Sequence, residues 1–414
     1  MGAVDARSTA ETGYERPARE PETRPIRVLY SFPHKIGAGR ICSTAWYQVT
    51  GVAEAGAAVD LHPGAVARTL PDGVAVSPTL ARGRVRVPYR VLGQQRALEL
   101  HDRIVARRLR KLAGAVDVVH AWPSGALETL RTARELGVPT VLERPNAHTA
   151  RAFAIVRAEE ERLGVSLPRG HEHSFDERAL RREEAEYSLA DRLLCPSPFV
   201  ETTFLEEGFP GEKLACHAYG FDETVFFPDA GPRDPARPFT AIFVGDNALR
   251  KGLHHALEAW RRSSASARGR FLVAGSLLPG YATRIRELLD QPGVEVLGRR
   301  SDVPELYRMS DVLCLPTLEE GSPLACLEAI GSGCVPVVSE VCAGVCRHGE
   351  NALLHAPGDV EALAADLTRL DRDRELLAEL REGALRAAPS LTWSAAGRRL
   401  LAVYGETVDP LGTA

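Results

Sequence analysis

The chain has 414 residues, of which 44% are hydrophobic and 26% are charged, a balance typical of globular proteins rather than disordered or fibrous ones. Because this length exceeds what one hydrophobic core usually organises, we expect two domains. The formal net charge of −4 argues against the basic surface that nucleic-acid binding requires, so we expect no nucleic acid partner.

Residues 1–24 are rich in Glu, Arg and Pro and contain no apolar stretch resembling a signal peptide or a membrane span. We predict a disordered tail there. Most of the eight cysteines lie inside apolar runs, as Cys195 and Cys314 do, where cysteine behaves as a small buried hydrophobe. We interpret them as reduced thiols and expect a cytoplasmic protein.

Between residues 25 and 227, short apolar runs alternate with longer amphipathic stretches, which predicts a parallel sheet flanked by helices. The predicted strands are Ile26–Phe32, Ala58–Leu61, Val116–His120, Thr140–Glu143 and Arg192–Cys195. Helix starts are predicted by a capping box at Ser174–Glu177 and by Ser197-Pro198, an N-cap serine followed by proline. This part is predicted to be a Rossmann-like N-terminal domain.

Residues 228–238 are too rich in Pro and Gly to continue a helix or strand, and we predict an interdomain linker there. A second alternating series over residues 239–390 predicts another Rossmann-like domain. Its predicted strands are Ala241–Val244, Phe271–Ala274, Val294–Leu297, Val312–Leu315 and Val335–Val338. Residues 391–414 are expected to form a helix that returns to the N-terminal domain. Ligands of such folds bind in the crevice at the strands' carboxyl ends.

The segment from Glu319 to Gly333 follows a predicted strand and contains a helix start, with Ser322 as N-cap and Pro323 as first helical residue. Because Pro323 has no N–H, the backbone donors available to a diphosphate are those of Ser322, Leu324 and Ala325.

Two glutamates flank this helix start. Glu328 lies about a turn and a half into the helix, where its carboxylate could accept hydrogen bonds from two ribose hydroxyls. Glu320 precedes the helix on the loop facing the crevice and could accept from hydroxyls of a transferred sugar. The alternative is that both merely favour the helix dipole, but their spacing in this context favours ligand binding.

A second polar loop runs from Gly245, where a predicted strand ends, to Arg250 and Lys251. These cations could neutralise the charge that grows on a leaving diphosphate. The alternative is an exposed basic turn. The position of the loop favours binding, because it and the helix start at Ser322 both follow strands of the same domain.

From about Ile26 to Tyr404 the chain resembles a retaining GT-B glycosyltransferase of glycosyltransferase family 4, with two Rossmann-like domains facing a cleft. The Glu320–Glu328 pair matches the E-x7-E motif of that family. Further similarities are Val244-Gly245 with Lys251-Gly252, Ala190-Asp191, Tyr219–Asp222 with Phe227-Pro228, and Asn351–Leu354.

The resemblance implies that Glu320 contacts the donor sugar, Glu328 the ribose and Lys251 the diphosphate of a UDP- or GDP-sugar. The donor is a co-substrate, with no cofactor and no metal, and the N-terminal domain lies on the acceptor side. One position departs from the family: many relatives have arginine after the glycine equivalent to Gly245, where this chain has Asp246. We hypothesise that Arg250 supplies that charge.

In the N-terminal half, the loop containing Gly37 and Gly39 resembles the glycine-rich loop that approaches the donor phosphates in this family. A nicotinamide-binding fingerprint is the alternative, but Cys42 stands where that motif needs a small residue. His148 follows another strand, and in similar proteins a histidine there approaches the sugar. Its alternative interpretation is a polar strand end.

No metal site is predicted. Cys342 and Cys346 lack a second ligand pair, and His171-Glu-His173 lacks a third ligand, so we interpret that pair as solvent-exposed polar residues. Asp371-Arg-Asp373 fits a solvated helix face. The basic stretch from Asp102 to Lys111 also fits a solvated face, with peripheral contact at the inner face of a membrane as the alternative.

These observations predict a metal-independent, retaining glycosyltransferase that moves a sugar from a nucleotide sugar to a hydroxyl of an unidentified polysaccharide, lipid-linked glycan or small molecule. Two alternatives stay open because a fold does not fix a reaction. One is a phosphorylase or epimerase acting on sugar nucleotides, and the other is a non-catalytic binding or scaffold subunit.

Overall fold

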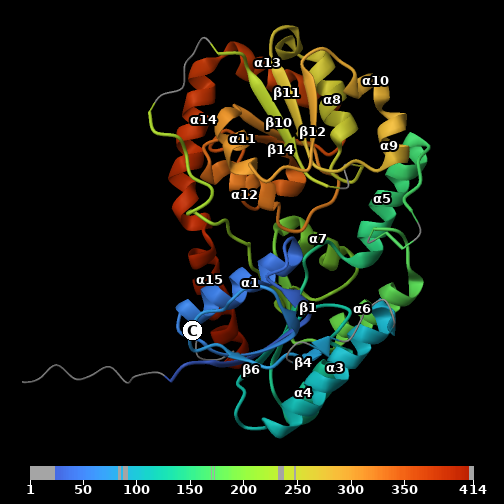
Figure 1. The fold of residues 1–414 in the computed structure, drawn as a ribbon, viewed down its shortest axis with the longest axis vertical. Coiled ribbons are helices and arrows are strands. Elements are labelled where there is room, and N and C mark those ends of the chain that lie inside the picture. Colours follow the sequence, from blue (N-terminus) through green and yellow to red (C-terminus); the bar gives the residue numbers. More distant parts are fainter. Residues whose placement is uncertain are drawn as a thin grey trace, which may run out of the picture.

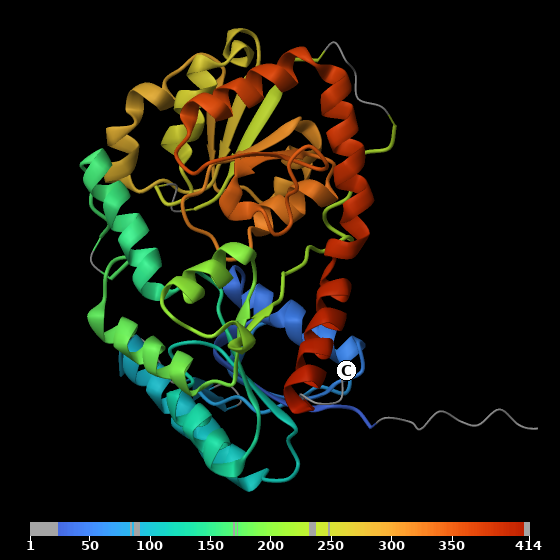
Figure 2. The ribbon, with the colours of Figure 1, turned by 180° about the vertical axis from the view of Figure 1, so that it is seen from behind.

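The computed structural model describes residues 24–82, 85–86, 92–168, 170–171, 173–231, 237–246 and 249–409. It consists of two parallel sheets, one above the other along the long axis, each flanked by helices (Figures 1 and 2). This confirms the predicted pair of parallel α/β units. The predicted tail, apart from Arg24, and residues 232–236 of the predicted linker lie outside the described residues.

The N-terminal sheet has seven parallel strands in the order β3-β2-β1-β6-β7-β8-β9. Their bounds are β1 Arg27–Ile36, β2 Ala58–Val66, β3 Ala75–Val76, β6 Val118–Ala121, β7 Thr140–Glu143, β8 Arg192–Cys195 and β9 Leu214–Cys216. A separate antiparallel pair joins β4 (Ala81–Arg82) and β5 (Val85–Arg86). The helices are α1 Ile41–Glu54, α3 Gln94–Lys111, α4 Leu127–Leu136, α5 Thr149–Leu163, α6 Glu177–Leu189 and α7 Pro198–Glu206.

The C-terminal sheet has six parallel strands in the order β12-β11-β10-β13-β14-β15. Their bounds are β10 Thr240–Val244, β11 Arg270–Ala274, β12 Val294–Gly298, β13 Val312–Leu315, β14 Val335–Ser339 and β15 Leu353–His355. The helices are α8 Leu253–Arg262, α9 Pro279–Arg284, α10 Arg286–Leu289, α11 Val303–Met309, α12 Leu324–Gly331, α13 Val360–Arg372, α14 Arg374–Ala387 and α15 Trp393–Val408.

All ten predicted strands are present, and most are apolar runs that both faces of a parallel sheet bury. The exception is the edge strand β12, which is partly exposed. The strands that sequence reasoning missed are the short β3, β9 and β15 at sheet edges and the β4–β5 pair. Of the two predicted helix starts, Ser197 caps α7 by accepting from the N–H of Val200. The capping box at Ser174 was wrong, since Asp176 caps α6 from the position directly before it.

Helix α15 packs across α1 beside the N-terminal sheet, as both ribbon views show (Figures 1 and 2). Its Leu400 and Tyr404 are buried in the same apolar cluster as β1 and α1. The two helices cross at glycines: a Cβ on Gly397 would lie 2.3 Å from the carbonyl oxygen of Gly51. The C-terminal helix is therefore part of the N-terminal core.

Helix α3 carries the basic stretch from Asp102 to Lys111. Asp102 is fully buried and accepts from the N–H groups of Glu128 and Thr129 at the start of α4. On the exposed side, Arg110 pairs with Glu135 at 3.0 Å. Among the described residues no helix is long and apolar enough to cross a bilayer, and the membrane contact stays a prediction. All eight cysteines are free thiols.

A fully buried polar network holds the end of β7, from which a loop leads toward the C-terminal sheet. Glu143 accepts from Gln48 Nε2 at 2.8 Å and from the Tyr219 hydroxyl at 2.9 Å. Gln48 in turn accepts from the Tyr30 hydroxyl at 2.7 Å. Burial raises the pKa of Glu143 to about 7. Near neutral pH, the protonated and ionised forms of its carboxyl group are therefore both populated.

This pKa predicts how stability depends on pH. The pKa of Glu143 in the folded chain lies above its ordinary value of 4.5, so between these two values the folded protein binds more protons than the unfolded chain. Its stability contribution therefore falls as pH rises through that window. Glu143→Gln cannot ionise and should lack this loss, worth up to about 3 kcal/mol.

Thermal unfolding of both proteins from pH 5 to pH 8 provides the measurement. We expect the Tm of the variant to increase relative to that of the wild type as the pH rises. A Tm difference that does not change with pH would show that the carboxylate ionises in the folded protein without penalty.

Candidate active site

The candidate site lies at the carboxyl ends of the C-terminal strands, where loops after four neighbouring strands come together. Gly245 follows β10, Ser276 follows β11, Arg299 follows β12 and Glu320 lies on the loop after β13. Parallel strands place all these loops at one edge of the sheet, which faces the N-terminal domain.

Two cations and two carboxylates from adjacent loops form a buried cluster at this edge. Lys251 Nζ lies 2.8 Å from Glu320 Oε2. Arg250 Nη1 lies 2.9 Å from Glu319 Oε2 and 3.6 Å from Glu320 Oε1. Although burial opposes ionisation, the charges of Lys251 and Arg250 lower the pKa of Glu320 to about 2. The structure thus brings together Glu320, Lys251 and Arg250.

Glycines make room for this cluster. A Cβ on Gly245 would lie 2.5 Å from Cδ of Lys251, so the lysine side chain crosses the end of β10 directly over this glycine. Gly252 has a φ of +72°, and a Cβ there would lie 2.1 Å from the carbonyl oxygen of Pro316. Both positions therefore need glycine for Lys251 to reach Glu320.

Helix α12 begins one residue later than predicted. Its N-cap is Pro323, whose ψ of 83° is not helical, and Leu324 is the first helical residue. The assignment of Ser322 as N-cap was wrong. The N–H of Leu324 donates to the carbonyl of Ser322 at 2.9 Å and is engaged within the turn.

Unpaired polar groups remain at this helix start. The N–H groups of Ser322 and Ala325 have no backbone acceptor among the described residues, and the Ser322 hydroxyl is buried without a hydrogen-bond partner. A buried hydroxyl without a partner is costly, so this group is available to donate to an acceptor atom.

Glu328 lies on the same helix, half-buried, and accepts from the Tyr307 hydroxyl at 3.4 Å. Burial raises the pKa of its carboxyl to about 7. Tyr307 is fully buried and orients one carboxyl oxygen of Glu328. The other oxygen has no hydrogen-bond partner among the described residues.

Asp246 is surrounded by groups that the sequence did not single out. Its carboxylate accepts from the backbone N–H of Ser276 at 2.9 Å and from Arg299 and Arg40, each at 2.7 Å. Arg250, which we expected to supply the missing cation, is instead buried against Glu319. Arg40 and Arg299 are the cations that meet at Asp246.

Arg40 belongs to the glycine-rich loop between β1 and α1. Gly37 and Gly39 have φ values of +77° and +94°, and Arg40 itself has a φ of 51°. This left-handed backbone directs the loop toward the C-terminal domain, where Arg40 reaches Asp246. The ion pair joins residues 206 positions apart, and it places the predicted glycines beside the Gly245 loop.

His148 differs from the other predicted residues. It occupies the N-cap position of α5, and its N–H donates to the Thr203 hydroxyl at 3.0 Å. Its ring packs among Tyr187, Phe204 and Phe209, and burial lowers its pKa to about 4. His148 makes no hydrogen bond or ion pair with Glu320 or Lys251 in the described chain.

Glu319, to which the sequence analysis assigned no role, joins the two domains. It is fully buried, and its Oε1 accepts from the N–H of Ala147 at 3.0 Å. Beside it, a Cβ on Gly321 would lie 1.7 Å from the carbonyl oxygen of Pro145. The loops that contain these residues, 145–147 and 319–321, are therefore in backbone contact.

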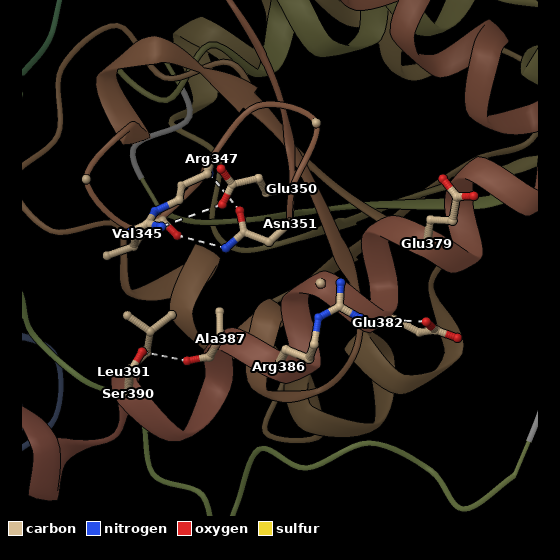
Figure 3. A pocket seen from close by; sticks show the side chains of 13 residues that line it. Val345, Arg347, Glu350, Asn351, Glu379, Glu382, Arg386, Ala387, Ser390 and Leu391 are labelled. Carbon is tan, nitrogen blue, oxygen red and sulfur yellow. Dashed lines mark hydrogen bonds and ion pairs between the residues drawn. The ribbon is translucent and has the colours of Figure 1, made fainter.

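Two sizeable pockets accompany the site. One of about 660 Å³ lies between the loop containing Arg347 and Asn351 and helix α14 (Figure 3), and no predicted site residue lines it. The other, of about 760 Å³, lies in the N-terminal domain beside Pro145 and Asn146. His171 and His173 line this second pocket and are half-buried, so they lie at the pocket wall rather than on an open face.

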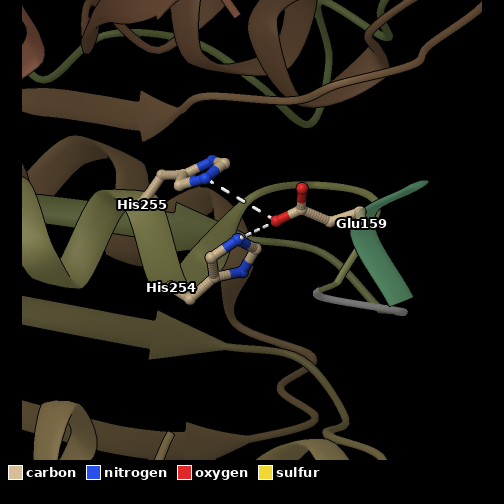
Figure 4. Close-up of side chains that lie close together, drawn as sticks. All are labelled: Glu159, His254 and His255. Atoms are coloured by element: carbon tan, nitrogen blue, oxygen red, sulfur yellow. Dashed lines mark hydrogen bonds and ion pairs between the residues drawn. The ribbon is translucent and has the colours of Figure 1, made fainter. Parts of the chain in front are cut away.

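A third interdomain contact joins α5 to α8. Glu159 Oε1 lies 2.5 Å from His254 Nε2 and 3.6 Å from His255 Nε2 (Figure 4). These three side chains could hold a metal ion. However, Arg162 donates to Glu159 at 2.9 Å and lies 2.8 Å from His255 Nε2, so a cation already faces the group. We describe it as an interdomain ion-pair cluster.

Comparison with known proteins agrees with this geometry. Residues 238–373 match the family described as glycosyl transferases group 1. A D-inositol 3-phosphate glycosyltransferase of Salinispora arenicola (strain CNS-205) is 27% identical, covering 97% of this chain and 96% of the relative.

Solved structures show the same fold. Sucrose-phosphate synthase from Thermosynechococcus elongatus superposes with a TM-score of 0.66 at 18% identity, covering 92% of this chain and 99% of that chain. Anabaena HepE in complex with UDP-glucose gives a TM-score of 0.62 at 15% identity, covering 93% and 100%. The predicted GT-B fold is confirmed, and the chain is a glycosyltransferase.

The contact between Gly321 and Pro145 generates a prediction. Gly321→Ala should push the two loops apart and displace the neighbouring Glu320, because the added Cβ would overlap a backbone carbonyl. A misplacement of about 1 Å at a reacting centre can cost 100-fold in rate. Steady-state turnover of a sugar donor, with small-angle scattering to follow the domain separation, tests this.

Gly280→Ala is the matched control, since a Cβ at Gly280 would meet nothing within 4 Å. Its turnover and scattering should equal those of the wild type. Normal turnover by the Gly321 variant would show that catalysis does not need these loops in contact.

Proposed function

We propose that the chain is a retaining glycosyltransferase that transfers a sugar from a nucleotide-sugar donor, a UDP- or GDP-sugar, to an acceptor hydroxyl without a metal ion. The observation that carries this proposal is the buried cluster of Lys251, Glu320 and Arg250 beside the unpaired hydroxyl of Ser322. It combines cations for a diphosphate with a carboxylate for sugar hydroxyls.

In this proposal the diphosphate lies between Lys251 and the start of α12. The N–H groups of Ser322 and Ala325 and the Ser322 hydroxyl donate to phosphate oxygens, since helix N-termini favour anions. Lys251, held by Glu320, shares its ammonium protons between that carboxylate and the phosphates. As negative charge grows on the leaving diphosphate, this fixed cation stabilises it more than it stabilises the bound donor.

The ribose and the sugar bind to the two glutamates. The unpartnered oxygen of Glu328 accepts from ribose hydroxyls, and the Tyr307 hydroxyl holds its other oxygen in place. Glu320 accepts from hydroxyls of the transferred sugar. Because the pKa of Glu320 lies near 2, its carboxylate is fully ionised at neutral pH. Its negative charge stabilises the positive charge that develops at the anomeric carbon.

The transfer itself needs no protein nucleophile. The acceptor oxygen forms a bond to the anomeric carbon on the face that the diphosphate leaves, the bond from that carbon to the diphosphate oxygen breaks, and the acceptor proton passes to the diphosphate. The contacts of Glu319 with Ala147 and of Asp246 with Arg40 support a closed arrangement, which limits competing hydrolysis by water.

The proposal predicts that activity survives chelation. Donor consumption is measured in excess EDTA, with and without acceptor. Acceptor-dependent release of nucleoside diphosphate should persist, because Lys251 and the N–H groups at the helix start stabilise the diphosphate charge without a metal ion. Loss of turnover in EDTA that Mg²⁺ or Mn²⁺ restores would contradict the metal-independent mechanism. Donor consumption without transfer would point to a different reaction on this fold.

A further prediction separates the two glutamates. Glu328→Gln should raise the KM for the donor and leave kcat nearly unchanged, because the ribose does not change during the reaction and its contacts are uniform. Glu320→Gln should lower kcat, because its contacts strengthen in the transition state. Hydrogen bonds to a charged acceptor are worth about 1.5–3 kcal/mol, or roughly 10- to 100-fold.

Steady-state kinetics on both variants provides the measurement, with circular dichroism to confirm that each is folded. A Glu328→Gln enzyme with reduced kcat and unchanged KM would contradict the assignment of the ribose. A Glu320→Gln enzyme with normal kcat would show that this carboxylate does not contact the reacting sugar.

A further inference from the structure

We propose that the 760 Å³ pocket of the N-terminal domain binds the acceptor, and that the acceptor is an uncharged polyhydroxylated group, such as the end of a neutral glycan. This inference rests on the proposed function, because it takes Glu320 as the position of the transferred sugar. The pocket is lined by selected residues of the segments 94–98, 123–124, 144–153, 170–171, 173–179 and 182–183.

The pocket opens beside the candidate active site. Pro145 and Asn146 line it, and the Pro145 carbonyl lies against Gly321, the residue after Glu320. His173 lines it as well. Burial lowers the pKa of His173 to about 3, and the positive charges of Arg250 and Lys251 also act on it. An acceptor in this pocket therefore extends toward the sugar bound at Glu320.

Six neutral amide or hydroxyl side chains line the pocket, as many as the charged side chains among its described lining residues. The neutral ones are Gln94, Gln95, Ser124, Asn146, Thr149 and Ser174. The amides of Gln94 and Asn146 make no hydrogen bond within the described chain, and each offers donors and an acceptor. With its low pKa, His173 is a neutral imidazole at neutral pH and adds no positive charge to the pocket. The neutral side chains of the lining match the hydroxyls of a sugar or polyol.

The charges of the pocket cancel one another. Arg144 pairs with Glu183 at 3.2 Å, Arg182 with Asp102 at 2.9 Å, and Arg178 with Glu99 at 3.0 Å. Each of these guanidinium groups already has a carboxylate partner. Among the described lining residues, none offers an unpaired cation to a phosphate.

The remaining charges of the lining disfavour an anion further. Asp176 and Glu177 add two carboxylates at the start of α6, of which Asp176 caps the helix and Glu177 pairs with Arg181 at 2.6 Å. A phosphorylated acceptor would therefore have to displace an existing ion pair, whereas a neutral one would not.

An aromatic pair supplies an apolar face. The ring centroids of Phe153 and Phe175 are 5.6 Å apart with an interplanar angle of 71°, and both residues line the pocket. The Phe175 side chain is 65% exposed, which is unusual for so large an apolar group. A small number of polar groups around aromatic rings is typical of ligand sites, and the C–H face of a sugar ring can cover the exposed ring.

The experiment uses two matched pairs of probes: myo-inositol with its 3-phosphate, and glucose with glucose 6-phosphate. Binding of each probe to the full-length protein is measured by saturation-transfer NMR, independently of turnover. Acceptor-dependent release of nucleoside diphosphate is measured in parallel with UDP- and GDP-sugars. We expect the neutral member of at least one pair to bind about 10-fold more tightly than its phosphate and to accelerate donor consumption.

Phe175→Ala should weaken binding of that neutral probe about 10-fold and raise its KM. Phe227→Ala is the matched control, because Phe227 is also an exposed aromatic residue, 48% accessible, but lines a different pocket. This control should behave as the wild type in both measurements.

Tighter binding of the phosphorylated members, no binding of either neutral probe, or equal effects of the two phenylalanine variants would each overturn the inference. Failure of the proposed function is distinct: it would appear as a protein that binds the neutral probe in a Phe175-dependent way yet consumes no donor.

Discussion

The buried ion pairs at the carboxyl edge of the C-terminal sheet are the interaction on which the rest of the site depends. Arg250 and Lys251 leave adjacent positions of one loop and meet Glu319 and Glu320, adjacent positions of the next. Charges buried at this depth are stable only with partners, so removing one leaves another uncompensated. The cluster therefore fixes both loops, and with them the start of α12 and its unpaired donors.

The same cluster also sets how the two domains meet. Glu319 uses one carboxylate oxygen for Arg250 and the other for the N–H of Ala147, so the charge pair of one domain orders a loop of the other. Arg40 with Asp246 and Glu159 with His254 add contacts from two further directions. The contact between Arg40 and Asp246 is partly exposed, whereas those of Glu319 and Glu159 are buried. Because all three are polar, they can break and re-form as domains move more readily than an apolar interface.

The sequence predicted the sheets better than the contacts, for a physical reason. A buried strand such as Val312–Leu315 is a local apolar run, whereas the bond between Glu319 and Ala147 joins residues 172 positions apart, which no local pattern encodes. Ser-Pro occurs at two helix starts with different outcomes: Ser197 caps α7, but Ser322 stays outside α12 with an unpaired hydroxyl. The dipeptide alone does not distinguish a cap from a site that awaits a ligand.

The two proposed substrate sites differ in charge balance, and this difference supports the proposed assignment of donor and acceptor. The proposed donor site contains four cations, Arg40, Arg250, Lys251 and Arg299, and four carboxyl groups, Glu319, Glu320, Glu328 and Asp246. Because burial raises the pKa of Glu328 to about 7, its carboxyl group is only partly ionised at neutral pH. The remaining excess of positive charge favours a diphosphate. In the pocket across the cleft each described arginine has its own carboxylate. A diphosphate therefore gains little there, which agrees with the proposal that donor and acceptor bind on opposite sides.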